Sequence, residues 1–188
     1  MMSAESEKLV LLLRGALIAT MIVLAAVLRI LPHPWNLTPV GAMALFSGAM
    51  FRNRWIAFAI PLAALLAGDV FVGFHKLMLI VYGSIAISIA IGRWLGENKT
   101  AARIGGAVFI GALQFFVITN FAMWAIGGFY SKTAAGLVNC FVAGVPFFWN
   151  TLAGDAMYAG VFFGGFALAE KLVPALRLAA AKTLPVRG

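Results

Sequence analysis

Long apolar runs without a charged residue are the feature that most limits the folds open to this sequence. Several are about 18 to 25 residues long, the length that an α-helix needs to cross a hydrocarbon layer of roughly 30 Å. Of the 188 residues, 63% are hydrophobic, whereas a soluble domain has roughly 45–50% apolar residues. The runs are continuous and do not alternate with polar residues, which argues against a transmembrane β-barrel. We therefore predict an all-α integral membrane protein.

Proline, glycine and charged residues divide the chain into a bundle of about six transmembrane helices, which we take as a single transmembrane domain over residues 1–188. The expected helices cover residues 9–31, 38–51, 55–74, 77–95, 103–128 and 146–171. The first is expected to be retained, because its apolar run is too long for a signal peptide. The second reaches only about 21 Å, so it is either a short helix held inside the bundle or a re-entrant segment.

The stretch before the last expected helix needs a break. Between residues 133 and 169 the only charged residue is Asp155, and one helix of this length would extend about 55 Å, too far for a single crossing. Gly144 and Pro146 are the expected breakpoint. Residues 133–145 would then form a re-entrant or interfacial stretch at the outer side.

Lysine and arginine predict the orientation. With six spans and the N-terminus inside, Arg29, Lys76 and Lys132 lie outside and the other 11 of the 14 basic residues lie inside. If residues 38–51 do not cross, the count is 10 inside and 4 outside, so six spans are slightly preferred. We expect the bacterial inner membrane, with both termini cytoplasmic. This distribution explains the net charge of +8 by orientation in the lipid bilayer, so no nucleic-acid partner is expected.

Two acids fall within expected spans, Asp69 and Asp155. A carboxylate inside a membrane is costly unless it is paired, hydrogen-bonded or beside a water-filled cavity, so it is a functional candidate by default. The alternative is a structural acid held by hydrogen bonds between helices. The two acids share the sequence Leu-Ala-Gly-Asp, which would fit an inverted repeat.

Other polar and aromatic residues are expected near the outer side with these acids, and Asn150 and Tyr158 could share a helix face with Asp155. Hydrogen-bonding groups of this variety suit a polar organic ligand better than a metal ion. The predicted substrate-binding residues are Arg29, His33, Asn36, Asp69, His75, Tyr82, Asn120, Trp124, Asn150, Asp155 and Tyr158.

The sequence lacks several common enzyme motifs. It has no Walker loop, no dinucleotide-binding glycine motif, no HExxH pair and no nucleophile elbow. An aspartyl protease dyad of Asp69 and Asp155 would require two carboxyl groups about 3 Å apart, which a sequence does not establish. We expect no catalytic residue, metal or cofactor.

Four segments resemble a family of small bacterial membrane proteins that are described as transport proteins. They are Arg29 to Phe46, Gly68 to His75 with Tyr82, Thr119 to Phe121, and Pro146 to Asp155. Such proteins are similar to the substrate-binding S components of energy-coupling factor transporters and to the solitary cobalamin transporter. The resemblance implies uptake of a micronutrient, such as a vitamin, a cofactor precursor or cobalamin, through an outward-facing pocket. It also implies that uptake is driven either by docking onto an ATPase-bearing energy-coupling module as partner or by a solitary route without one.

Two alternatives remain open at this point. A membrane scaffold or assembly subunit would leave no cavity among the outer polar residues. An ion-coupled solute carrier would use Asp69 and Asp155 in exchange. The sequence indicates neither the solute nor the energy source.

Overall fold

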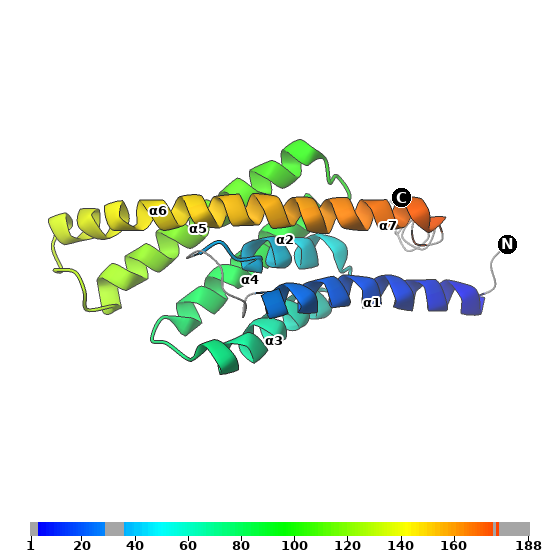
Figure 1. Ribbon diagram of the computed structural model, residues 1–188, viewed down its shortest axis with the longest axis horizontal. Helices are drawn as coiled ribbons and strands as arrows, with labels where there is room; N and C mark the ends of the chain where they lie inside the picture. The colour runs from blue at the N-terminus through cyan, green and yellow to red at the C-terminus, as the bar shows by residue number, and fades with distance from the viewer. Residues whose placement is uncertain (1–3, 29–35, 175, 177–188) are drawn as a thin grey trace, which may run out of the picture.

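The computed structural model describes residues 4–28, 36–174 and 176, and in these ranges it is helical without a strand (Figure 1). The helices are α1 (Ala4–Leu28), α2 (Val40–Met50), α3 (Arg54–Val72), α4 (Met78–Leu95), α5 (Ala101–Ile126), α6 (Ala134–Ala159) and α7 (Gly165–Leu172), with a π-helical turn, η1 (Gly160–Gly164), between the last two. Five helical stretches are long and apolar enough to cross a membrane. The prediction of an all-α membrane bundle is therefore confirmed.

Side chains and glycines define the helix ends. Asn53, Thr100 and Thr133 accept hydrogen bonds from backbone amides in the first turns of α3, α5 and α6, as N-cap residues do. Gly73 and Gly96 follow the last residues of α3 and α4 with φ of 100° and 52°, a conformation that other residues rarely adopt. Most helices consequently begin and end within a few residues of the predicted bounds.

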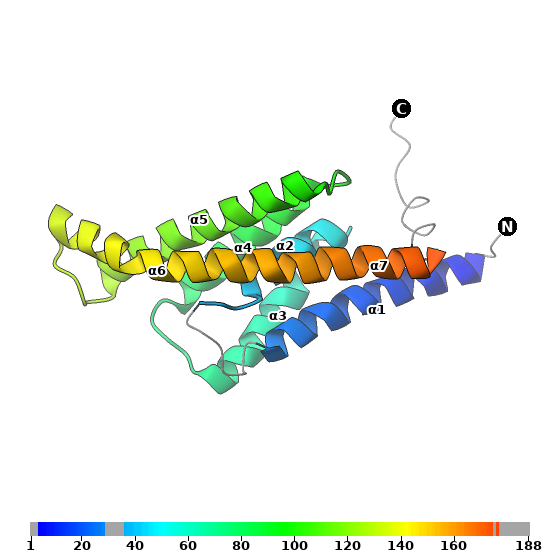
Figure 2. The same ribbon diagram turned by 45° about the horizontal axis from the view of Figure 1, so that its top comes forward.

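Helix α1 begins and helix α7 ends toward the same end of the bundle. The start of α1, the end of α7 and the loops 51–53 and 96–100 lie toward one end, which we call the basic end (Figures 1 and 2). The loops 73–77 and 127–133 lie toward the opposite end, which we call the cavity end. This arrangement is the one expected of an even number of passes. Which side of the membrane each end faces stays a prediction.

The short helix α2 occupies the centre of the bundle and contacts α1, α3, α4, α5 and α6. Eight of its 11 residues are buried. Phe46 packs against the rings of Phe162, Phe163 and Phe166 with centroids 5.3–5.9 Å apart. The sequence left open a short helix inside the bundle or a re-entrant segment, and α2 is the former.

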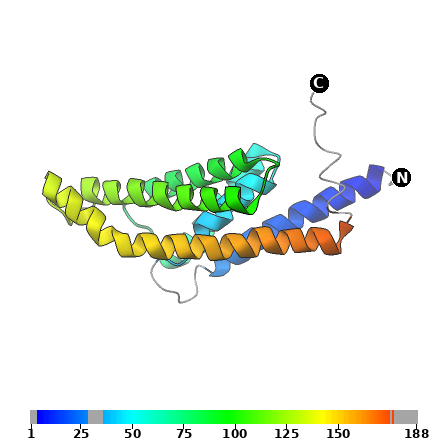
Figure 3. The ribbon, with the colours of Figure 1, turned by 90° about the horizontal axis from the view of Figure 1, so that it is seen from above.

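The predicted break at Gly144 and Pro146 is wrong. The helical stretch continues from Ala134 to Leu172, and Figure 3 shows that it bends along α6 without breaking. The reason is tertiary packing on both sides of the proline. The ring of Phe116 on α5 lies 5.4 Å from that of Phe141 and 5.3 Å from that of Phe148. One proline, which costs about 3 kcal/mol in a helix, does not outweigh these contacts, so residues 133–145 are not a re-entrant stretch.

Candidate functional site

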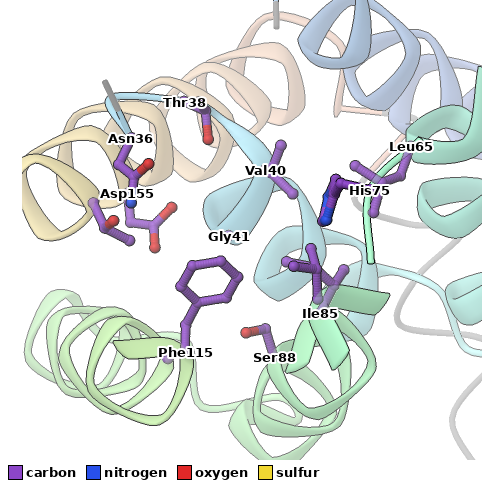
Figure 4. Close-up of a pocket in the computed structure, with 13 residues that line it drawn as sticks. Asn36, Thr38, Val40, Gly41, Leu65, His75, Ile85, Ser88, Phe115 and Asp155 are labelled. Carbon is purple, nitrogen blue, oxygen red and sulfur yellow. The ribbon is translucent and has the colours of Figure 1, made fainter. Parts of the chain in front are cut away.

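A cavity of about 210 Å³ lies beside the N-terminus of α2 (Figure 4). Its polar lining residues are Asn36, Thr38, His75, Ser88, Thr151 and Asp155. Its other lining residues are Val40, Gly41, Leu65, Val81, Ile85, Gly111 and Phe115. The lining comes from α2, α3, α4, α5, α6 and the segments before α2 and α4. The cavity is thus a meeting point of segments that are distant in the sequence.

Asp155 is 3% exposed and stabilises the start of α2. Its Oδ1 accepts a hydrogen bond of 2.9 Å from the amide of Ala42, and the amide of Gly41 also hydrogen-bonds the carboxylate. The N-cap residue of α2 is Pro39, which offers no side-chain hydrogen bond. Amides in the first turn of a helix have no partner within the helix and carry partial positive charge. A carboxylate from α6 therefore takes the place of a local cap.

Gly41 makes this contact possible. A Cβ atom at this position would lie 2.3 Å from Oδ2 of Asp155 and 2.4 Å from Oδ1, closer than atoms approach without a clash. Only a residue without a side chain lets the carboxylate reach the backbone of α2. The hydrogen bonds from the start of α2 to Asp155 therefore require a glycine at position 41.

Ser88 on the cavity wall is held by Gln114 of α5. The side-chain amide nitrogen of Gln114 donates to Oγ of Ser88 at 3.0 Å and to the carbonyl of Ser84 at 3.0 Å. Ser84 in turn donates to the Gln114 side-chain oxygen at 2.9 Å. This network fixes α4 against α5 and orients a hydroxyl at the cavity.

Thr151 lies one turn before Asp155 on α6 and also lines the cavity. Its hydroxyl donates to the carbonyl of Phe147 at 2.9 Å. The donor is therefore used within the helix, and the oxygen can still accept a hydrogen bond.

His75 and Asn36 are exposed residues of the lining, so the cavity reaches the surface near them. In Figure 4 His75 and Asp155 lie on opposite sides of Val40 and Gly41. Asn36 has a positive φ of 63°, which asparagine tolerates better than most residues.

A second cavity of about 450 Å³ adjoins the first at Asn36. Its other polar lining residues include Thr119, Asn120, Tyr130 and Cys140. The Nδ2 atom of Asn120 donates to the carbonyl of Phe116 at 2.8 Å. Of the predicted residues, Asn120 therefore lies in this second cavity and not around Asp155, whereas Asn36 lines both cavities.

Asp69 is placed differently from Asp155. It is 2% exposed and its Oδ2 accepts a hydrogen bond of 2.7 Å from the hydroxyl of Tyr82. This bond joins α3 to α4, and neither residue lines the two cavities. The two helices that carry the acids, α3 and α6, run in opposite directions (Figure 1), but the acids have unlike partners.

The remaining predicted residues lie away from both cavities or outside the described part of the chain. Trp124 is near the tip of the α5–α6 hairpin, where its indole nitrogen donates to the carbonyl of Ser131 at 2.9 Å. Tyr158 stacks on Phe162 with centroids 6.3 Å apart. Asn150 lines neither cavity. Arg29 and His33 fall outside the described residues.

Sequence reasoning did not include Thr38, Ser88, Gln114 or Phe115 in the site. Ser88 and Gln114 are polar residues in the middle of apolar runs. This pattern could have indicated that they form hydrogen bonds between helices. Phe115 is one of 16 phenylalanines, and nothing in the sequence distinguishes it. Within the described residues, no three His, Cys, Asp or Glu side chains gather in a way that could hold a metal ion.

Comparison with known proteins identifies a family to which the chain is similar. The model of a protein family described as a family of unknown function (DUF6580) matches residues 11–176. No curated protein and no solved structure matches the chain.

Proposed function

The chain belongs to this family of unknown function, and we propose that it is a membrane transport protein that binds a small organic solute in the two cavities for uptake. The observation that carries the proposal is the first cavity. Helix bundles pack densely and leave few voids larger than a water molecule. This bundle instead keeps a space of about 210 Å³ next to a buried carboxylate. A cavity beside a carboxylate supports the proposal of a bound solute that donates hydrogen bonds.

The lining indicates the chemistry of the solute. Asp155, Thr151 and Asn36 offer hydrogen-bond acceptors to the cavity, and Ile85 and Phe115 offer apolar surface. A solute with hydrogen-bond donors at one end and a short apolar body fits this division.

The sizes of the cavities favour a small solute. Ligand pockets usually measure about 300–1,000 Å³, so the first cavity is small and the solute would extend past Asn36 into the second. Cobalamin is far larger than the first cavity, and we therefore favour a smaller vitamin or cofactor precursor.

We also propose a direction and an energy source for transport. The mouth of the first cavity lies near His75 at the cavity end, which the distribution of basic residues predicts to be outside. The resemblance of the four sequence segments to proteins that are similar to S components is the basis for proposing an energy-coupling module with an ATPase as partner.

A thermal-shift screen tests solute binding. The purified protein in neutral detergent is heated with each member of a panel of vitamins and cofactor precursors. A ligand present at 100 times its Kd stabilises the folded state by about 2.7 kcal/mol. We expect a panel member to raise Tm, and we expect Thr151→Val to weaken its binding about three- to tenfold, since one hydrogen bond contributes about 0.5–1.5 kcal/mol.

Thr20→Val is the matched control, because Thr20 is exposed on α1 and lines neither cavity. It should leave the shift unchanged. If no panel member shifts Tm of a well-folded sample, or if Thr20→Val lowers the affinity as much as Thr151→Val, the proposal loses its support. The scaffold reading, in which Asp155 only caps α2, would then be preferred.

A further inference from the structure

A groove of about 530 Å³ lies at the basic end, between the first half of α1, the end of α2 and the end of α4. Four cations line it, Arg14, Arg52, Arg93 and Lys99. The carboxylates near them are Glu97, which also lines the groove, and Glu170, which pairs with Arg14. Positive charge is therefore in excess, and the groove favours an anion.

Two of the cations are fixed in place. Arg14 donates to the carbonyl of Leu176 at 2.9 Å, and its guanidinium lies 4.7 Å from the centroid of the Phe166 ring. Arg93 donates to the carbonyl of Phe51 at 3.2 Å, just past the end of α2. These contacts position positive charge on two sides of the groove without an added ligand.

The other two cations form no close ion pair with the carboxylates described. Neither Arg52 nor Lys99 forms an ion pair with any residue that the structure describes. Burial, and after it the nearby guanidinium of Arg14, lower the pKa of Lys99 below its ordinary value, and the carboxylates of Glu170 and Glu97 offset this lowering only in part. The charge on Lys99 is thus disfavoured in the protein alone, and an anion in the groove would offset that cost.

The remaining wall of the groove is apolar, with Leu11 and Ile18 of α1 and Met50 of α2. Leu11 is 39% exposed, so this wall continues into the outer surface of α1. A free phosphate gains no favourable contact from such an apolar surface. A lipid, in contrast, can place its glycerol and acyl chains against it.

Tryptophans place the groove at the depth of lipid headgroups. Trp55 and Trp94 are 70% and 67% exposed, and they follow directly after Arg54 and Arg93 at the basic end. Exposed tryptophans of membrane proteins gather at the membrane–water interface. Arg54 and Arg103 lie over these two rings at 4.9 and 5.0 Å, and this also places positive charge at the interface.

We propose that this groove binds the headgroup of an anionic phospholipid, whose phosphate lies among Arg52, Arg93 and Lys99 and whose acyl chains follow α1. The site is separate from the solute cavities and does not depend on the function proposed above. A bound lipid would link the first half of α1 to the ends of α2 and α4.

The test uses the full chain in nanodiscs of phosphatidylcholine, with and without a minor fraction of phosphatidylglycerol. The variant Arg52→Gln with Lys99→Gln removes the two unpaired cations. Its matched control, Arg54→Gln with Lys171→Gln, removes the same charge from exposed positions outside the groove. We expect phosphatidylglycerol to raise Tm of the wild type and the control, and to raise Tm of the groove variant by less than half as much.

An equal rise in all three proteins, or no rise in the wild type, would overturn the proposal. Glycerol phosphate added to phosphatidylcholine nanodiscs distinguishes the sources of phosphate, and if it reproduced the full rise in the wild type the site would be one for a soluble anion and not for a lipid. If the double variant does not fold, Arg52→Gln alone replaces it, because Arg52 is exposed. The single variant should then show a smaller rise than Arg54→Gln alone.

Discussion

Asp155 shows how one residue can satisfy both a structural and a functional interpretation. Its carboxylate accepts hydrogen bonds from two backbone amides of α2 and also lines the first cavity. The sequence predicted a buried acid with a special environment, and this holds for Asp69 as well. What the sequence did not contain was the partner of each acid, because Gly41 and Tyr82 meet them only through the fold.

Replacing Asp155 tests the capping role. Asp155→Ala leaves two amides without their acceptor in a buried place, so we expect a loss of about 1–3 kcal/mol in the free energy of unfolding. Asp155→Asn keeps an acceptor oxygen and should lose less than half of that amount. Denaturant unfolding in detergent measures both. Glu5→Ala, at an exposed acid of α1 that lines none of the cavities, is the control and should change little. Wild-type stability of Asp155→Ala would show that α2 does not need this cap.

Helix α2 and helix α4 approach each other through glycines, and this contact holds the central helix in place. A Cβ atom on Gly48 would lie 2.0 Å from the carbonyl oxygen of Ile89, and one on Gly92 would lie 2.1 Å from that of Leu45. Neither carbonyl can move without displacing its helix. Small residues at such positions let two helix backbones come close.

Adding a methyl group to α4 at two positions tests this contact. Gly92→Ala forces α2 and α4 apart, and we expect a loss of about 1–3 kcal/mol, as overpacking usually costs. Gly83→Ala is the control on the same helix, where nothing lies within 4 Å of the added atom. Alanine favours a helix over glycine by about 0.8–1.0 kcal/mol, so Gly83→Ala should be stabilising. Unfolding curves that place both variants on the same side of the wild type would contradict the packing described here.

The elements show where local sequence rules suffice and where they do not. Apolar length and capping residues predicted most helices, because these are properties of the segment itself. The break at Pro146 was wrong because the local cost of a proline competes with ring contacts to Phe116 that the sequence does not reveal. The short α2 was identified as unusual by its length alone, and its burial among the other helices explains why it can be shorter than a lipid-exposed helix.

At the scale of the whole molecule, the basic residues predict the orientation and cysteine labelling tests it. In a Cys140→Ala background, Lys132→Cys places a thiol at the cavity end and Arg54→Cys places one at the basic end. A maleimide that does not cross membranes should label the first in intact cells and the second only after lysis, because the basic end is expected in the cytoplasm. The reverse pattern would put the cavity mouth inside the cell and contradict uptake from outside.

The candidate site could be predicted only in part. Asn36, His75 and Asp155 line one cavity, and Asn120 meets Asn36 in the next. Tyr82, Trp124 and Tyr158 instead contact other parts of the protein. A polar residue near a membrane surface serves equally well as a ligand contact, a link between helices or an interfacial anchor, and only the packing of the helices distinguishes these roles.

Equilibrium binding to two glycine variants of α5 tests the central claim most directly. Gly111 lines the first cavity, and an added Cβ atom would meet its nearest neighbour, Cδ1 of Leu45, at 3.7 Å, which is ordinary contact. Gly106 on the same helix has nothing within 4 Å and lines neither cavity. Both alanine variants should fold, and each is measured with the panel member that stabilises the wild type.

If that solute occupies the cavity, the extra methyl group of Gly111→Ala should weaken its binding by about tenfold or more, whereas Gly106→Ala should bind it like the wild type. Equal affinity of both variants and the wild type would show that the solute does not bind in this cavity.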